Sequence, residues 1–244
     1  MDQLPLAPNC KVLLNHPCGI LVLEKAPGIL THPNPKPKSI SNKSKTSLLE
    51  AEYDYEGEFY HYGNFKRLYL THRLDSPTSG VIIATNELKL AEEIKKKFKS
   101  GKIQKVYHAI VFPKAPIQRG IWRDSLVEKK INGKLRVIRH HTGITAKTHC
   151  SLVESRTCRS MMMLKLIPIT GRTHQLRVQA ALRNHPIVGD KNYGDFKLNR
   201  KIHKDFKINR LLLHATEIKM EIEGKTIIAK SSIPEEFTEL INVN

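Results

Sequence analysis

The stretch THRLDSPTSGVIIA at residues 71–84 places one carboxylate, that of Asp75, between an arginine and a turn, and an apolar run follows. The run at residues 81–84 is short, continuous and rich in β-branched side chains, which predicts a buried β-strand. Asp75 would then lie where a loop enters that strand, at the edge of a core that controls its ionisation. An Asp in this position is more often only a turn former, so its neighbours decide the interpretation.

Two neighbouring features favour a functional role for Asp75. Arg73 lies two residues earlier, so an ion pair or a contact that fixes the backbone is available. The Thr-Ser-Gly run at residues 78–80 can donate hydrogen bonds and form a tight turn. We therefore expect a carboxylate that is held rigidly beside a cation.

A second polar cluster, ITGRTHQLRV, occupies residues 169–178. Its pattern is that of a strand end, a turn and a helix start, with Thr173 as the expected N-cap. Arg177 lies one helical turn further on, and a buried arginine needs a carboxylate partner. Asp75 is the candidate partner if the two runs meet; otherwise Arg172 and Arg177 are solvated contacts to phosphate. The spacing alone leaves both alternatives open.

Short strands separated by turns make up most of the remaining chain. The segment at residues 19–25 has the pattern of a strand, and residues 88–98 keep a helical period that ends at Gly101 as a C-cap. The Asn132-Gly133 pair is a strong hairpin signal. The Pro-, Lys- and Ser-rich segment at residues 34–46 has too little apolar content to pack, so we expect a mobile loop. The sum is an α+β fold dominated by antiparallel strands.

The charge balance favours a partner with many phosphates. The 244 residues carry 41 Lys and Arg against 23 Asp and Glu, a formal net charge of +18. Neutralising phosphates releases condensed counterions, which drives binding to nucleic acid. No stretch is apolar enough to cross a membrane, and the N-terminus lacks the pattern of a signal peptide. We expect a cytoplasmic protein.

Other kinds of site have little support in the sequence. Cys150 and Cys158 are eight residues apart, which matches no common zinc spacing, so free thiols are the simpler interpretation. The chain has no phosphate-binding glycine loop, no His-Glu-x-x-His and no Gly-x-Ser-x-Gly. Nucleotide hydrolases, dinucleotide oxidoreductases, zinc proteases and α/β-hydrolases are therefore excluded.

Six motifs, in order, resemble the RluA family of pseudouridine synthases, which isomerise uridine to pseudouridine in structured RNA. They are GILVLEKAPGILTHP at 19–33, HRLD with TSG at 72–80, KVY at 105–107, GRTHQLR at 171–177, HPIVGD with YG at 185–194, and LLLHA at 211–215. Ordered matches over most of the chain are far more specific than any one motif alone. Gln179 departs from many relatives, which have His there.

The resemblance assigns roles to individual residues. It implies that Asp75 is the catalytic carboxylate, that Tyr107 contacts the target base and that Arg177 pairs with Asp75. Leu213 would line the pocket of the base. The residues that we expect to bind the substrate RNA are, with Leu213, Arg73, Arg172 and His72.

The family fold implied is a mixed, mainly antiparallel sheet in two halves around a central catalytic cleft, flanked by a few helices. We expect a lead-in at residues 1–18 and a catalytic domain at residues 19–244. Many relatives carry a small N-terminal RNA-binding module, which we expect this chain to lack. The segment at residues 34–66 matches the short forms of the family poorly, and we expect it to help choose the RNA.

The expected activity is that of an isomerase that detaches uracil from ribose at N1 and rejoins it through C5. Asp75 would attack C1′, promote loss of uracil toward a glycal, or attack C6, and the sequence leaves these modes open. The reaction is redox-neutral, so we expect that it needs no cofactor or metal. We also expect the protein to be a monomer. The expected partner is a stem-loop of rRNA or tRNA. The alternative is a non-catalytic, basic RNA-binding protein on the same fold, against which the complete set of Asp75, Tyr107 and Arg177 speaks.

Overall fold

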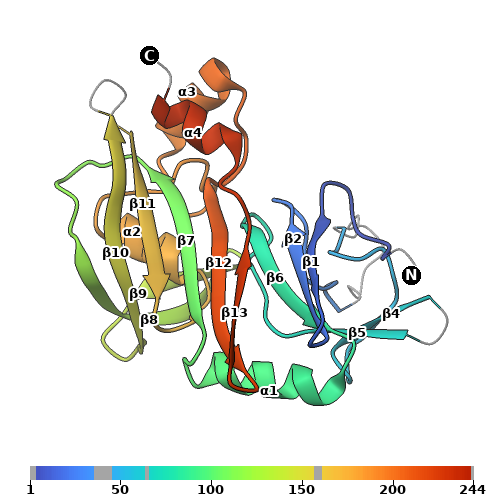
Figure 1. Ribbon diagram of the computed structural model, residues 1–244. Coiled ribbons are helices and arrows are strands. Elements are labelled where there is room, and N and C mark those ends of the chain that lie inside the picture. Colours follow the sequence, from blue (N-terminus) through green and yellow to red (C-terminus); the bar gives the residue numbers. More distant parts are fainter. Residues whose placement is uncertain (1–3, 36–45, 64–65, 157–160, 243–244) are drawn as a thin grey trace. The chain divides into compact units, whose positions relative to one another are not determined.

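The computed structural model describes residues 4–35, 46–63, 66–156 and 161–242 (Figure 1). Within these residues the strands form one mixed, mainly antiparallel sheet of 13 strands, and four helices accompany it. The α+β prediction is confirmed. Contacts divide the chain into two compact units, which are Met1–Ile103 with Ile218–Ser231, and Gln104–Glu217 with Ser232–Asn244.

The first unit is built around a strand that is buried along its whole length. This strand, β6, contains the predicted run at 81–84, and all seven of its residues are buried. It pairs with β2 on one side and β5 on the other, and β1 pairs with β2. The strands of this unit are β1 (Lys11–His16), β2 (Ile20–Lys25), β3 (Tyr53–Asp54), β4 (Phe59–Tyr62), β5 (Lys66–Leu70), β6 (Ser79–Thr85) and β13 (Lys225–Lys230).

The helix of the first unit, α1 (Leu88–Lys99), packs its apolar stripe onto this sheet. Leu90 and Ile94 share a buried cluster with Val81 and Ile83 of β6. The helix ends at Lys99 and its C-cap is Ser100, so Gly101, the expected C-cap, lies one residue later, where its φ of +71° is the left-handed geometry common after a helix. The strand β1 lies within the expected lead-in at residues 1–18.

The second unit carries its own sheet order, β7-β11-β10-β8-β9. Its elements are β7 (Gln104–Val111), β8 (Gly120–Ile131), β9 (Lys134–Arg139), β10 (Ile144–Arg156), β11 (Met161–Pro168), α2 (Gln175–Leu182), α3 (Phe196–Phe206) and α4 (Glu235–Asn242). The strand β12 (Leu213–Ile222) contributes residues to both units. Within this unit α2 buries Leu176 and Ala180 against Ala109 and Leu164 of the sheet.

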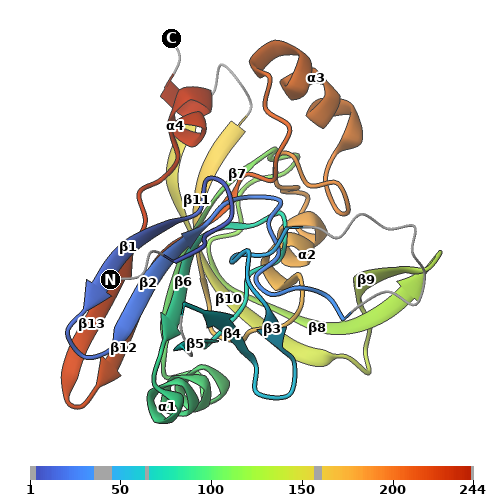
Figure 2. The ribbon, with the colours of Figure 1, turned by 90° about the vertical axis from the view of Figure 1, so that its right-hand side faces the viewer.

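The hairpin between β8 and β9 confirms the Asn132-Gly133 signal. Asn132 and Gly133 have φ values of +50° and +71°, the left-handed geometry of a two-residue hairpin turn. Figure 2 shows the paired strands running on past α2 to this turn. The hairpin therefore presents its polar side chains at a free end of the unit.

Two expectations meet limits or corrections here. The N-cap of α2 is His174, in the left-handed conformation with a φ of +52°, and not Thr173. The loop expected at residues 34–46 falls mostly on residues 36–45, which lie outside the described residues. Among the described residues, no helix combines the length and the apolar composition that crossing a bilayer requires.

Candidate active site

Asp75 lies half-buried in the loop between β5 and β6, and the residue before it is fixed by one threonine. The hydroxyl of Thr31 donates to the carbonyl oxygen of Leu74 at 2.9 Å and accepts from the amide of Leu74 at 3.1 Å. Thr31 is itself buried, and its own carbonyl oxygen accepts from the hydroxyl of the buried Tyr60 at 3.0 Å. Leu74 therefore has both of its backbone groups bound at one point.

The residue after Asp75 is held from the same segment. The ammonium of Lys25, which is fully buried, donates to the carbonyl oxygens of Ser76 at 3.0 Å, Ala26 at 3.0 Å and Ile29 at 2.8 Å. The amide of Gly28 donates to the Ser76 carbonyl at 2.8 Å, and the Ser76 hydroxyl returns a bond to the Gly28 carbonyl at 2.8 Å. Both neighbours of Asp75 are thus bound by residues 25–31, and the backbone that carries the carboxylate is fixed on both sides.

The two residues predicted beside Asp75 on the RNA side lie differently. The side chain of Arg73 is exposed and forms no ion pair or hydrogen bond within the described part of the chain, so the ion pair to Asp75, one of the two contacts considered for it, is not seen there. The ring of His72 is half-buried, accepts from the amide of Ile83 through Nε2 at 3.0 Å and packs against Phe98. His72 therefore also fixes the loop to β6.

In the second unit Arg177 is buried, with 3% of its side chain exposed, and is therefore not a solvated contact to phosphate. Its Nε donates to Oδ2 of Asp190 at 2.8 Å and its Nη2 to Oδ1 at 2.9 Å, which is the bidentate fork. The amides of Asn192 and Tyr193 also donate to Asp190. Burial alone opposes ionisation of Asp190, but the hydrogen bonds and charge of Arg177, with these two amides, hold its pKa below the ordinary value.

Asp190 is the residue that the sequence did not single out as a partner. It stands in the HPIVGD run, thirteen residues after Arg177, directly behind Gly189. Gly189 has a φ of +77°, and a Cβ there would collide with the carbonyl oxygen of Arg210. The signal in the sequence was only the pair Gly189-Asp190, because the need for glycine at this position is seen in the structure alone. The pairing of Arg177 with Asp75 stays a prediction.

Tyr193 connects this ion pair to the start of α2. The guanidinium of Arg177 lies over its ring at 5.2 Å from the centroid. Its hydroxyl is within hydrogen-bonding distance of Nδ1 of His174, at 2.8 Å, and accepts from the amide of Val137 at 2.9 Å. Burial raises the pKa of Tyr193, so the hydroxyl stays protonated at neutral pH. The ring therefore fixes both the guanidinium and the turn before the helix.

The structure brings two more predicted residues into one apolar cluster. Tyr107 lies half-buried on β7, opposite Leu166 of β11. Leu213, the first residue of β12, is buried in the same cluster, together with Leu176, the residue before Arg177. The ring expected to meet the base thus packs in the same apolar cluster as Leu213, the residue expected to line its pocket.

Known proteins that resemble the chain belong to one family. The family described as RNA pseudouridylate synthase matches residues 19–182, which hold Asp75, Tyr107 and Arg177. That match covers more than half of the chain. The chain belongs to the RluA-like family of RNA pseudouridine synthases.

Relatives in this family are 30–34% identical to the chain over the residues that align. A tRNA pseudouridine synthase C of Pectobacterium carotovorum is 30% identical over 212 residues, which are 82% of this chain and 53% of the relative. An uncharacterized RNA pseudouridine synthase of Zymomonas mobilis is 34% identical over 174 residues, 70% of this chain and 75% of the relative. A ribosomal large subunit pseudouridine synthase C of Buchnera aphidicola is 33% identical over 189 residues, 72% and 57%. The chain thus spans about half the length of the first and third of these relatives.

Solved structures agree in fold. Human RNA pseudouridylate synthase domain containing 1 superposes with a TM-score of 0.69 at 20% identity, covering 96% of this chain and 86% of that one. Human RNA pseudouridylate synthase domain containing 4 gives a TM-score of 0.67 at 21% identity, covering 93% and 90%. At these identities the likeness concerns the fold alone.

Buried amides hold the family's GRTHQLR segment in place. Gln175 donates to the Lys147 carbonyl at 2.9 Å, and its Oε1 accepts from the Thr170 hydroxyl at 2.7 Å and from the amide of Arg172 at 3.0 Å. Gln179, which departs from many relatives, accepts from Thr148. Arg172 itself is exposed, and its Nε donates to the carbonyl oxygen of Thr145 at 3.3 Å.

Of the two cysteines considered as metal ligands, Cys150 and Cys158, the structure describes only Cys150. Cys150 is buried, and burial raises its pKa to about 12, which keeps the thiol protonated at neutral pH. Cys158 lies outside the described residues. Among the residues that the structure does describe, no three His, Cys, Asp or Glu side chains are grouped as a metal site would need.

Proposed function

We propose that the protein is an RNA pseudouridine synthase that isomerises uridine in rRNA or tRNA, with Asp75 as the catalytic carboxylate. The observation that carries the proposal is the fixation of Leu74 by Thr31 and of Ser76 by Lys25, on either side of Asp75. A carboxylate presented by a fixed backbone loses little freedom when it meets its substrate. Family membership supplies the reaction class that such a carboxylate serves.

The chemistry asks for an ionised and oriented carboxylate. The N1–C1′ bond of uridine breaks, the uracil turns, a C5–C1′ bond forms, the hydrogen of C5 leaves as a proton and N1 takes up a proton. Asp75 would act at C1′, by direct attack or by promoting a glycal, or at C6 of the base. Each mode needs the charged form of Asp75, so substitution by Asn would stop all three.

The other predicted residues take supporting roles in this proposal. Tyr107 would contact the extruded base and Leu213 would line its pocket, which agrees with their shared apolar cluster. Arg177, oriented by Asp190, would face Asp75 and favour its charged form. His72, Arg73 and Arg172 would lie on the RNA side, and the exposure of the two arginines supports this.

The substrate class follows from charge and from the names of relatives. One relative is named for tRNA and another for the large ribosomal subunit. The net charge of +18 suits either RNA. We propose that residues 19–244 act as the catalytic domain, that the 34–66 segment contributes to the choice of RNA, and that the protein acts as a monomer, which its elution volume in gel filtration would test.

The activity itself can be tested without knowledge of the target uridine. Because the C5 hydrogen leaves, RNA made with [5-³H]uridine should release tritium to water when it is incubated with the protein. The substrates are total tRNA and rRNA from cells that lack this gene, so that the target sites are unmodified. The same RNA carrying [5-³H]cytidine is the control and should release none. No release above that control from either RNA would overturn the proposal.

A further inference from the structure

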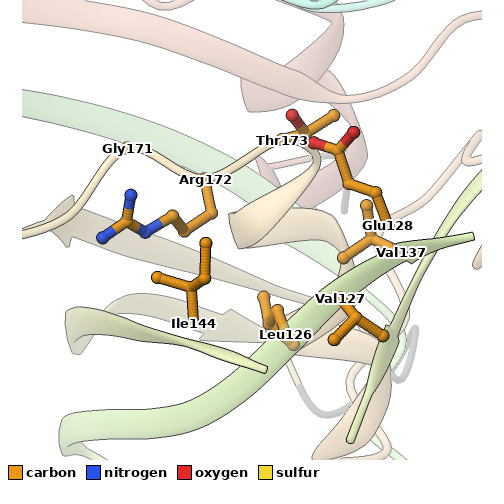
Figure 3. Close-up of a pocket in the computed structure, with 8 residues that line it drawn as sticks. All are labelled: Leu126, Val127, Glu128, Val137, Ile144, Gly171, Arg172 and Thr173. Carbon is orange, nitrogen blue, oxygen red and sulfur yellow. The ribbon is translucent and has the colours of Figure 1, made fainter. Parts of the chain in front are cut away.

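The second unit contains a surface hollow that has no role so far, although Arg172, one of the residues expected on the RNA side, lies at its edge. It measures about 440 Å³ and lies between the β8–β9 strands and the turn before α2 (Figure 3). Its base is apolar, since Leu126 and Val137 are buried there, and Ile144 stands at its side with 60% exposure. A volume of this size holds a nucleobase with room for part of its ribose.

The polar groups of the hollow stand at two separate places. Figure 3 shows the guanidinium of Arg172 at one end, and the carboxylate of Glu128 beside Thr173 at the other, with Ile144 and Leu126 between them. Arg172 is held in this direction, because its Nε donates to the carbonyl oxygen of Thr145 at 3.3 Å. The arrangement is thus a donor group and an acceptor group on either side of an apolar floor.

Glu128 is unusual for its surroundings. The strands β8 and β9 carry two acids, and one of these, Asp124, is buried and bound to Arg183 and Gln179 at 2.8 Å each. Glu128 is exposed and forms no ion pair or hydrogen bond within the described part of the chain. The same two strands carry six cations, which are Arg123, Lys129, Lys130, Lys134, Arg136 and Arg139.

This combination discriminates between parts of an RNA. The six cations attract phosphates, whereas the carboxylate of Glu128 repels them and can only accept hydrogen bonds, from N–H or O–H groups. On a nucleobase such groups lie on the Watson–Crick edge, which is exposed when a base leaves its stack. Guanine offers N1–H and the N2 amino group side by side to one carboxylate, and its O6 and N7 accept from an arginine. Adenine turns an unprotonated N1 toward the same carboxylate, which costs affinity.

We propose that this hollow binds an unpaired guanine of the substrate RNA, outside the catalytic site. The base lies over Ile144 and Leu126, Glu128 accepts from N1–H and N2–H, and Arg172 donates to the O6 and N7 edge. The neighbouring cations hold the flanking phosphates. This inference rests on the proposed function, because it takes RNA as the partner, and it adds a base that the protein reads besides the target uridine.

The test uses two fluorescent oligouridine strands that differ only in one central base, guanine or adenine. Their phosphates are equal in number, so the electrostatic contribution cancels in the comparison. By fluorescence anisotropy, the parent protein should bind the guanine strand roughly tenfold more tightly or better, as expected for a bidentate base contact. Glu128→Gln should abolish the preference, because its amide places a donor where guanine also donates.

The control is Glu239→Gln on α4, which removes the same charge from an exposed site of the same unit. It should keep the guanine preference, and thermal unfolding should show that both variants are folded. Equal binding of the two strands by the parent, or a preference that survives in Glu128→Gln, would overturn the inference and leave the proposed function intact. No binding of either strand would overturn the inference, and the tritium-release assay would then decide separately on the proposed function.

Discussion

Arg177 and Asp190 form a buried, bidentate ion pair in which both carboxylate oxygens and two guanidinium nitrogens take part. A single substitution that leaves one of two such charges buried is costly, by about 3–5 kcal/mol. We therefore expect Asp190→Asn to lower the free energy of unfolding by that amount, measured by urea titration. Glu93→Gln, which breaks the exposed pair with Lys97, should cost only about 0.3–0.5 kcal/mol.

The double variant separates the pair from its surroundings. With Asp190→Asn already present, Arg177→Ala should cost less than it does in the parent, because the pair is already broken. Arg177→Lys should rescue little, since an ammonium cannot reproduce the planar fork. Additive losses in the free energy of unfolding would mean that Arg177 stabilises the fold through another carboxylate, for which Asp75 is the predicted candidate.

The same carboxylate predicts a direction for the pH dependence of stability. The folded pKa of Asp190 is lower than its ordinary value of 3.8, so the unfolded chain takes up its proton first as the pH falls. Its contribution is then fully present above pH 3.8 and is lost as the pH falls through the folded pKa. Urea titrations from pH 6 downward should show a smaller loss for Asp190→Asn than for the parent. Parallel curves would show that the pKa of Asp190 is the same in the folded and the unfolded chain.

A further prediction concerns the threonine that holds Leu74. Thr31→Val keeps the shape but removes both hydrogen bonds to Leu74, which leaves a buried amide and a buried carbonyl unsatisfied. We expect a loss of about 1–3 kcal/mol in stability for such groups. We also expect kcat to fall more than KM changes, because Asp75 loses its orientation, and Thr31→Ser should restore kcat. A kcat equal to the parent's in a folded Thr31→Val protein would show that this contact does not position Asp75.

Sequence patterns predicted the elements whose signals are local. The buried strand β6, the helix α1 with Gly101 and the hairpin at Asn132 all follow from neighbouring residues. The N-cap of α2 was wrong because Gln175, one residue into the helix, folds back and accepts from the amide of Arg172. A side chain that reaches back across its own turn leaves no signal in the spacing.

The site was predictable to the same extent. The structure buries Arg177 and so decides between the two alternatives that the spacing left open for it. The contact of Arg177 with Asp190 depends on how the chain returns after α2. The contact of Thr31 with Leu74, forty-three residues apart, likewise depends on how the segment at 25–31 packs against the loop before β6. Contacts of this kind are decided by packing, and periodicity does not reveal them.

Removal of metal ions should leave the activity unchanged. Cys150 is buried, and among the described residues no three His, Cys, Asp or Glu side chains are grouped as a metal site would need. Tritium release should therefore continue after exhaustive dialysis against a chelator and without added nucleotide. Loss of turnover that one added metal restores would contradict this expectation.

Salt dependence tests the basic surface. A protein that makes 6–10 phosphate contacts loses about 10³–10⁵ in affinity between 50 and 200 mM salt. With a net charge of +18, we expect binding of total tRNA to fall steeply over this range. A flat titration would show that the cations do not form the RNA-binding surface.

The central claim is that the carboxylate of Asp75 performs the chemistry. Asp75→Asn keeps the shape of the side chain and the backbone bonds of Leu74 and Ser76, but it removes the charge. The direct measurement is the single-turnover rate of tritium release from [5-³H]uridine RNA by the purified variant, with RNA binding measured in parallel. We predict no detectable release, with affinity for the RNA within a few-fold of the parent's. Loss of a catalytic group lowers a rate by about a hundredfold or more. Release at more than about a hundredth of the parent rate would therefore contradict the assignment.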